Sequence, residues 1–136
     1  MPNYDPSHYD PPAPVAQVTL RDLSGGPLLP NVLLLLDTGA DITMLPRAAV
    51  ERLGVKPVIG KGYELLGFDG SRSTSQAVEL DMIFLNKAYR GRYLLVGDER
   101  GILGRDVLSN VVLRLDGPRQ EWSEQEAANG KPPDAH

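Results

Sequence analysis

The segment LLLLDTGADITML, residues 33–45, constrains the fold more than any other part of the chain. Its run of leucines is typical of a strand that is buried on both sides, and this run ends in a carboxylate, Asp37. A charge beside apolar surroundings costs free energy unless it is paired, hydrogen-bonded or used in chemistry. Thr38 and Gly39 come next, so the strand can deliver Asp37 to a tight loop where Thr38 supplies a hydroxyl and Gly39 a backbone free to turn.

Composition narrows the classes of function. The chain has 136 residues, no cysteine and a formal net charge of −4, which fits one domain without disulfides, thiol nucleophiles or cysteine-based zinc sites. The basic residues are dispersed, and no apolar stretch is long enough to span a membrane. We therefore expect no nucleic-acid partner and no membrane partner. Because the N-terminus does not resemble a signal peptide, a cytoplasmic location is expected.

The placement of the two histidines limits the available chemistry. His8 lies in a proline-rich arm and His136 is the last residue, so a Ser-His-Asp triad or a multi-histidine metal site would depend on a terminal tail. The sequence also contains no phosphate-binding P-loop, no EF-hand loop and no G-x-S-x-G motif. We expect no metal and no cofactor, and any catalysis must rest on carboxylates, Lys, Arg or Tyr.

The chain is expected to divide into a folded domain and two tails. Residues 1–14 are rich in proline and predict a flexible N-terminal arm, and residues 118–136 predict a polar, flexible C-terminal tail. Trp122 in this tail is expected to be exposed or loosely docked. The folded domain is then residues 15–117.

Within the domain, the pattern of apolar residues predicts mainly strands. Strands are expected at 15–20 and 32–36, followed by a helix at 46–54 with Pro46 at its first position and Gly54 at its end. Two hairpins follow, one with GFDG (67–70) at its tip and one that turns near Asn86 and Lys87. A strand at 102–103, a short helix at 104–110 and a final strand at 111–115 complete the domain. This pattern predicts a mainly β fold with one or two short helices.

The combination of LLDTGADITML with the later GILGRDVLSNVVLRL resembles the retropepsin family, the single-domain aspartic proteases of retroviruses and their cellular and bacterial relatives. The resemblance covers about residues 15–117 and implies a closed barrel of the acid protease type. It also implies a homodimer, because the chain contains only one Asp-Thr-Gly. The helix at 46–54, the charge on Asp69 and the residues after VVLRL depart from the compact viral enzymes.

The resemblance implies a role for each residue of these motifs. Asp37 would be the catalytic aspartate, and Thr38, Gly39 and Ala40 would form the active-site loop. Thr38 would form a hydrogen bond with Thr38 of the second chain in the dimer. Asp41 would line the substrate cleft and pair with Arg105 in the same chain. The substrate-binding flap would have Gly67, Phe68, Asp69 and Gly70 at its tip, and Gly104, Arg105 and Asp106 would give structural support.

The function implied by this resemblance is that of an aspartic endopeptidase. Peptide hydrolysis without a metal or a covalent nucleophile needs two carboxyls that share one proton, and a homodimer would supply them as its two Asp37 side chains. The partners would be a second copy of the chain and a polypeptide substrate. The alternative is a catalytically silent peptide-binding or dimerisation module on the same fold.

Overall fold

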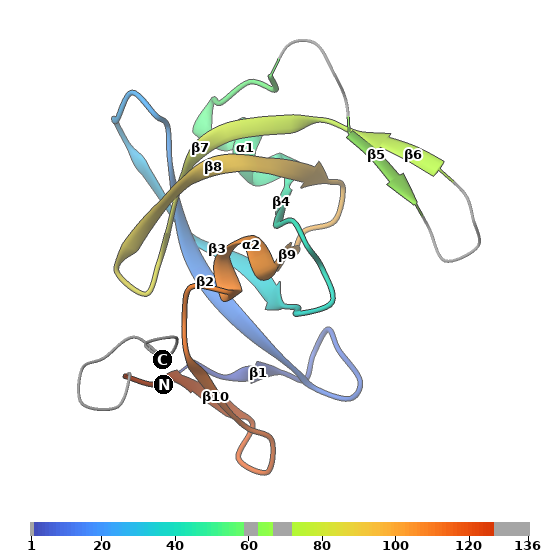
Figure 1. The fold of residues 1–136 in the computed structure, drawn as a ribbon, viewed down its shortest axis with the longest axis vertical. Helices are drawn as coiled ribbons and strands as arrows, with labels where there is room; N and C mark the ends of the chain where they lie inside the picture. Colours follow the sequence, from blue (N-terminus) through green and yellow to red (C-terminus); the bar gives the residue numbers. More distant parts are fainter. Residues whose placement is uncertain (1, 59–62, 67–71, 127–136) are drawn as a thin grey trace, which may run out of the picture.

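A closed β-barrel forms the centre of the fold (Figure 1). The computed structural model describes residues 2–58, 63–66 and 72–126. Neighbouring strands of the barrel are, in order, β2 (Ala13–Arg21), β3 (Leu28–Leu36), β9 (Gly101–Leu103), β4 (Met44–Pro46), β8 (Lys87–Val96) and β7 (Ala77–Phe84). The barrel closes because β7 also pairs with β2. The predicted mainly β, closed-barrel fold is confirmed.

Shorter elements lie around the barrel. The helices are α1 (Arg47–Leu53) and α2 (Arg105–Leu108), and β5 (Tyr63–Leu66) pairs with β6 (Arg72–Ser75) in a separate hairpin. Strand β1 (Tyr4–Asp5) pairs with the start of β2. Strands β10 (Leu113–Asp116) and β11 (Glu121–Glu124) form a further antiparallel pair, drawn at the bottom of Figure 1. In the described part of the chain, no helix is long and apolar enough to cross a membrane.

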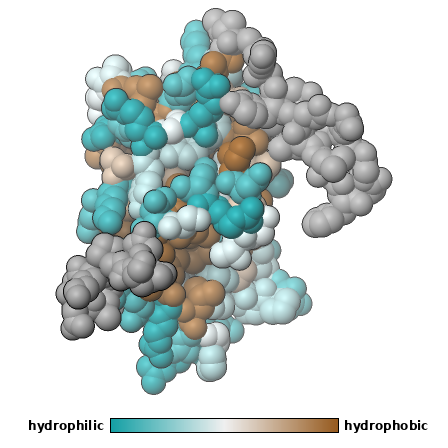
Figure 2. Space-filling view, in the orientation of Figure 1, coloured by the Kyte–Doolittle hydropathy of each residue, from teal (hydrophilic) through white to brown (hydrophobic). Residues whose placement is uncertain are grey.

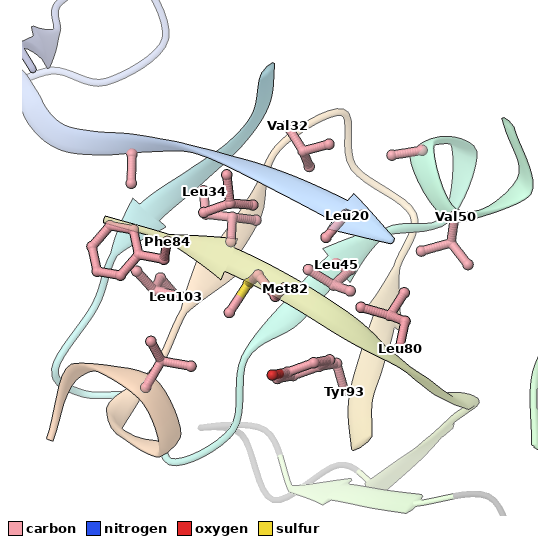
Figure 3. Packing of buried hydrophobic residues seen from close by; sticks show 14 of the residues in the cluster. Leu20, Val32, Leu34, Leu45, Val50, Leu80, Met82, Phe84, Tyr93 and Leu103 are labelled. Atoms are coloured by element: carbon pink, nitrogen blue, oxygen red, sulfur yellow. The ribbon is translucent and has the colours of Figure 1, made fainter. Parts of the chain in front are cut away.

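The hydrophobic core fills the barrel, as Figure 3 shows. Leu34 lies on the inner face of β3, and Leu103 lies on β9, which runs parallel to β3. Leu80 and Met82 point inward from β7 toward the same centre. The leucine run predicted to be buried therefore alternates: Leu34 is buried, whereas Leu33 and Leu35 are only half-buried. The buried side chains fix the position of β3, which ends at Leu36, just before Asp37.

The first helix differs slightly from the prediction. Pro46 is not the first helical residue; it ends β4 and caps α1 with an extended backbone, because β4 pairs parallel with β8 up to Pro46 and Val96. Gly54 ends the helix as predicted, in a left-handed conformation with φ of 86°. That conformation is unfavourable for residues with a Cβ atom, which explains the glycine. The predicted turn near Asn86 is also confirmed, since Leu85 and Asn86 join β7 to β8.

Both chain ends carry strands outside residues 15–117. The expectation that Trp122 is exposed or loosely docked is wrong, because its side chain is 2% exposed. Its ring packs at 6.0 Å between centroids from Phe84, and its indole N–H donates to the carbonyl of Val15 at 2.8 Å. Little in the sequence indicates that Trp122 packs into the core, because its neighbours are polar and it is the one buried side chain of β11. Strand β10 is consequently not the last strand of the chain.

A buried carboxylate on the outer side of the barrel joins three strands. Asp81 on β7 is 2% exposed and accepts hydrogen bonds from Arg90 on β8 at 3.0 and 3.2 Å and from Arg21 on β2 at 3.0 Å. The Arg90 guanidinium, followed by that of Arg21, lowers the pKa of Asp81, although burial alone would raise it. These ion pairs therefore stabilise the pairing of β2 with β7 that closes the barrel.

The lowered pKa of Asp81 predicts a stability contribution that depends on pH. Because the pKa is lower in the folded chain than in the unfolded one, the contribution is complete above the unfolded value, about 3.9, and is lost as the pH falls through the folded value. We expect Asp81→Asn to lower the melting temperature at pH 6, and the difference from wild type to shrink toward pH 2–3. Thermal melts of wild type and Asp81→Asn across this pH range test this prediction, and exposed Asp98→Asn is the control. A difference between Asp81→Asn and wild type that does not change with pH would contradict it.

Candidate active site

The loop after β3 holds Asp37 in a defined position. Its backbone N–H donates to the carbonyl of Leu103 on β9 at 3.0 Å, so the sheet pairing of β3 and β9 continues into the loop. One carboxylate oxygen, Oδ1, accepts the N–H of Gly39 at 2.9 Å. Within the described residues, Oδ2 has no hydrogen-bond partner. Asp37 is half-buried, while Thr38 and Gly39 are exposed, so its second oxygen is available to another molecule.

The glycine at position 39 lies very close to this carboxylate. A Cβ atom there would lie 3.1 Å from Oδ1 of Asp37, closer than ordinary van der Waals contact. With a side chain at position 39, the Asp37 carboxylate would have to shift by a few tenths of an ångström. Glycine therefore allows the carboxylate to stay where the Gly39 N–H binds it.

The start of α2 packs directly against the same loop. A Cβ atom on Gly104 would lie 2.9 Å from the carbonyl oxygen of Ala40 and 2.9 Å from the carbonyl carbon of Ile42, so only glycine fits. The Arg105 N–H donates to the Ala40 carbonyl at 2.8 Å. The segment GRD and the segment DTGA, far apart in sequence, are thus in backbone contact. The close approach of the two segments leaves no room for a side chain at position 104.

Arg105 supports the loop differently from the prediction. Its guanidinium donates to the carbonyl of Thr38 at 2.6 Å. Among the described residues, no ion pair joins Arg105 to Asp41, so the predicted pairing is not present. Asp41 is exposed, and water can satisfy its charge, whereas the Thr38 carbonyl offers Arg105 an acceptor fixed by the loop.

A buried threonine that the sequence analysis did not select connects the two segments. Thr43 is 0% exposed. Its N–H and hydroxyl donate to the two oxygens of Asp106 at 3.0 and 2.7 Å, and its hydroxyl accepts the N–H of Gly104 at 3.0 Å. Asp106 therefore holds Thr43 by two hydrogen bonds, and Thr43 in turn holds the Gly104 N–H. Nothing in the sequence marks Thr43, because a threonine between Ile42 and Met44 is also typical of an ordinary strand.

Loss of the Thr43 hydroxyl is predicted to destabilise the fold. Thr43→Val keeps the shape of the side chain but leaves the buried Gly104 N–H without its acceptor, which costs about 1–3 kcal/mol. We expect a lower unfolding midpoint in urea with an unchanged slope. Thr19→Val on β2 is the matched control, because no hydrogen bond of its hydroxyl is present among the described residues. Equal midpoints for the two variants would contradict the role of Thr43.

Two predicted features cannot be placed. The flap tip, Gly67, Phe68, Asp69 and Gly70, lies outside the described residues. The bond between Thr38 and its counterpart concerns a second chain. In the described ranges, no group of three or more His, Asp or Glu side chains is arranged to hold a metal ion.

A closed barrel that presents an Asp-Thr-Gly loop between β3 and the start of α2 defines the class of retropepsin-like aspartic proteases. A family model described as aspartyl protease matches residues 16–107, and the chain belongs to this family. Among solved structures, it is similar to that of EIAV protease complexed with the inhibitor HBY-793, with 27% identity and a TM-score of 0.57. The similarity covers 71% of this chain and 86% of that one. No match is found among curated proteins. The resemblance to retropepsins is confirmed.

Proposed function

We propose that the protein is an aspartic endopeptidase that acts as a homodimer. The observation that carries this proposal is the state of Asp37: half-buried at the end of a rigid strand, held through Oδ1 by the Gly39 N–H, with Oδ2 left without a partner in the described residues. The free oxygen Oδ2 can therefore share a proton with a second carboxyl or accept a proton from water. Membership of the aspartyl protease family supports the same conclusion.

The second carboxyl of the reaction has to come from a second chain. The sequence contains a single Asp-Thr-Gly, and among the described residues no hydrogen bond joins Asp37 to another carboxyl group. Two Asp37 side chains related by a two-fold axis would share one proton between them, because two ionised carboxylates at short distance repel each other. This arrangement supplies one base and one acid at the same time.

The reaction then proceeds without a covalent intermediate. The ionised Asp37 takes a proton from a water molecule as the water oxygen attacks the peptide carbonyl carbon, while the protonated Asp37 gives its proton to the carbonyl oxygen. The resulting tetrahedral diol collapses as the C–N bond breaks. The Asp37 that took the proton from water gives it to the leaving nitrogen, and the other Asp37 regains a proton from a hydroxyl of the diol. The products are a carboxylic acid and an amine, and the pair again holds one proton.

The remaining site residues are assigned to binding the substrate. Thr38, Gly39 and Ala40 form the loop next to the reacting bond, and the exposed Asp41, four residues beyond Asp37, is assigned to substrate contact. Gly67, Phe68, Asp69 and Gly70 are assigned to substrate binding from the sequence. An extended peptide would bind by backbone hydrogen bonds, with side-chain pockets giving specificity.

Digestion of a peptide library, read by mass spectrometry, tests the proposal. Wild type is incubated with the library from acidic to neutral pH, beside Asp37→Asn at the same concentration. New peptide ends that appear only with wild type support endopeptidase activity. If the two proteins give the same peptides at every pH, the silent peptide-binding module is the correct function.

A further inference from the structure

A hollow beside α1 contains two arginines that the proposed chemistry does not use. This α1 hollow has a volume of about 280 Å³ and lies between β3, α1 and the turn before β9, with Asn31, Arg52, Glu99 and Arg100 as its polar side chains. Among the described residues, none from the Asp37 loop or from α2 lines it. Sites for small molecules usually have about 300–1,000 Å³, so the α1 hollow has room for one small ligand group.

Arg100 is held at this hollow by its neighbours. It directly precedes Gly101, which pairs with Leu34 and has no room for a Cβ atom because the Met44 carbonyl oxygen occupies that position. The side chain of Arg100 is only 22% exposed, and its guanidinium lies over the ring of Tyr9, 6.0 Å from the ring centroid. A ring contact uses the face of the guanidinium and leaves its in-plane N–H donors available. In the described part of the chain, these donors have no hydrogen-bond acceptor.

Arg52 reaches the same hollow from the outer face of α1. Val50 is 1% exposed and points into the core, as Figure 3 shows. Ala48 and Arg52 are four residues apart, so they share the opposite face of the helix. The small side chain of Ala48 leaves space beside Arg52, and both residues line the hollow. Arg52 is exposed, and within the described ranges its guanidinium makes no hydrogen bond or ion pair.

A bulge in β3 adds an amide to the two guanidiniums. The register between β2 and β3 shifts between Val18 and Leu20, so that Pro30 and Asn31 lie opposite a single residue of β2. Asn31 has a φ of 62°, a left-handed conformation that asparagine tolerates better than most residues. Its side chain lines the α1 hollow and has no hydrogen-bond partner among the described residues. The amide therefore offers two further N–H donors.

Two guanidiniums and an amide around one hollow match the chemistry of a phosphate group. A guanidinium binds two phosphate oxygens at once through parallel N–H donors. A phosphate monoester at neutral pH has three acceptor oxygens and a charge close to −2, so it can bind both arginines, whereas a carboxylate has one charge and two oxygens. We propose that the α1 hollow binds a phosphate monoester or inorganic phosphate, with Arg52 and Arg100 on its oxygens and Asn31 donating a further hydrogen bond.

Such binding has to come from these residues and not from a general attraction for anions. The chain has 18 acidic and 14 basic residues, and hydrophilic residues are interspersed with hydrophobic ones over the face drawn in Figure 2. Glu99 also lines the hollow, but it is 91% exposed and its contact with Arg100 is 4.0 Å long, beyond a hydrogen bond. Its charge repels phosphate, so the α1 hollow contains residues with opposite expected effects on affinity.

Isothermal titration calorimetry of the full chain with inorganic phosphate, at pH 7.5 and constant ionic strength, tests the site. Arg52→Gln and Arg100→Gln are each expected to weaken binding roughly tenfold, because each removes charged hydrogen bonds to the anion. Glu99→Gln is expected to strengthen it by about two- to fivefold, the effect of one exposed charge. Arg119→Gln, outside the hollow and with its side chain 78% exposed, is the matched control and should leave the affinity unchanged.

A peptide that contains phosphoserine distinguishes the two sources of the phosphate group. It is titrated beside the same peptide with unmodified serine, both into the Asp37→Asn chain so that the peptides stay intact. Tighter binding of the phosphopeptide than of inorganic phosphate, weakened by Arg52→Gln, would identify a phosphorylated polypeptide as the ligand. Tighter binding of inorganic phosphate would identify a small phosphate compound. Binding of neither probe, or equal affinities in wild type and both arginine variants, would overturn the proposal.

Two controls keep the result independent of folding and of the chemistry at Asp37. Arg52→Gln changes an exposed side chain without a partner in the described residues, so it should melt at the wild-type temperature. It decides the test even if Arg100→Gln, which loses the contact with Tyr9, fails to fold. Asp37→Asn should bind inorganic phosphate as tightly as wild type. A loss of phosphate binding in Asp37→Asn, with Arg52→Gln unaffected, would place the anion at Asp37 and overturn the α1 hollow as the site.

Discussion

Asp37→Asn is expected to lower peptide hydrolysis by roughly 10²–10⁴-fold, the usual contribution of a positioned acid or base. Asparagine keeps the size of the side chain, and its amide oxygen can still accept the Gly39 N–H that Oδ1 accepts at 2.9 Å. The fold and the dimer should therefore persist while the shared proton is lost. The measurement is kcat/KM on one peptide identified in the library digest, with the melting temperature as the control for folding.

Mixing the two chains extends this test to the dimer. If each active site needs both Asp37 residues, a ninefold excess of Asp37→Asn chains should leave wild-type chains mostly in heterodimers with one catalytic carboxylate, and activity per wild-type chain should fall about tenfold by mass action. Exposed Asp98→Asn in the same excess is the matched control and should add activity. Full retention of wild-type activity in the mixture with Asp37→Asn would show that one chain is sufficient.

The sequence predicts the loop around Asp37 well because its physical requirements are local. A buried apolar strand, a carboxylate and a glycine occupy consecutive positions, and each has its own signature. The same holds for α1, which ends at Gly54 in the left-handed conformation that favours glycine. The barrel was also predictable, since mainly strand-like segments and the GRD motif pointed to one family.

Other contacts could not be predicted because they join distant segments that are ordinary when considered singly. Thr43 matters through Asp106 and Gly104, some sixty residues away along the chain. Arg105 reaches the Thr38 carbonyl rather than Asp41, a choice that depends on the position of α2 over the loop. From the sequence alone, a nearby carboxylate such as Asp41 is the obvious partner for Arg105. The sequence does not show that the Thr38 carbonyl would lie within reach of its guanidinium.

The burial of Trp122 could not be predicted for a related reason. Composition describes the average environment of a segment, and residues 118–126 are polar on average. One large side chain can nevertheless fix such a segment if it finds an apolar site. Trp122 does so against Phe84, and the pairing of β11 with β10 and with residues 2–4 supplies the backbone hydrogen bonds.

Trp122→Ala is expected to destabilise the folded chain by about 3–5 kcal/mol, the usual cost of removing a buried aromatic side chain from a core. The loss includes packing against Phe84, and it leaves the Val15 carbonyl without the indole N–H that it accepts at 2.8 Å. Since β11 pairs with β10 along its whole length, the position of β10 should be disturbed as well. Urea unfolding followed by circular dichroism measures the free energy of unfolding.

Two truncations distinguish the role of this side chain from that of the polar tail. A chain that stops at residue 126 keeps β11 and should unfold at the same urea concentration as the full chain. A chain that stops at residue 117 loses β11 together with Trp122, so it should be at least as unstable as Trp122→Ala. If the chain ending at 117 is as stable as the full chain, the segment is a dispensable tail after all and the burial of Trp122 contributes nothing to folding.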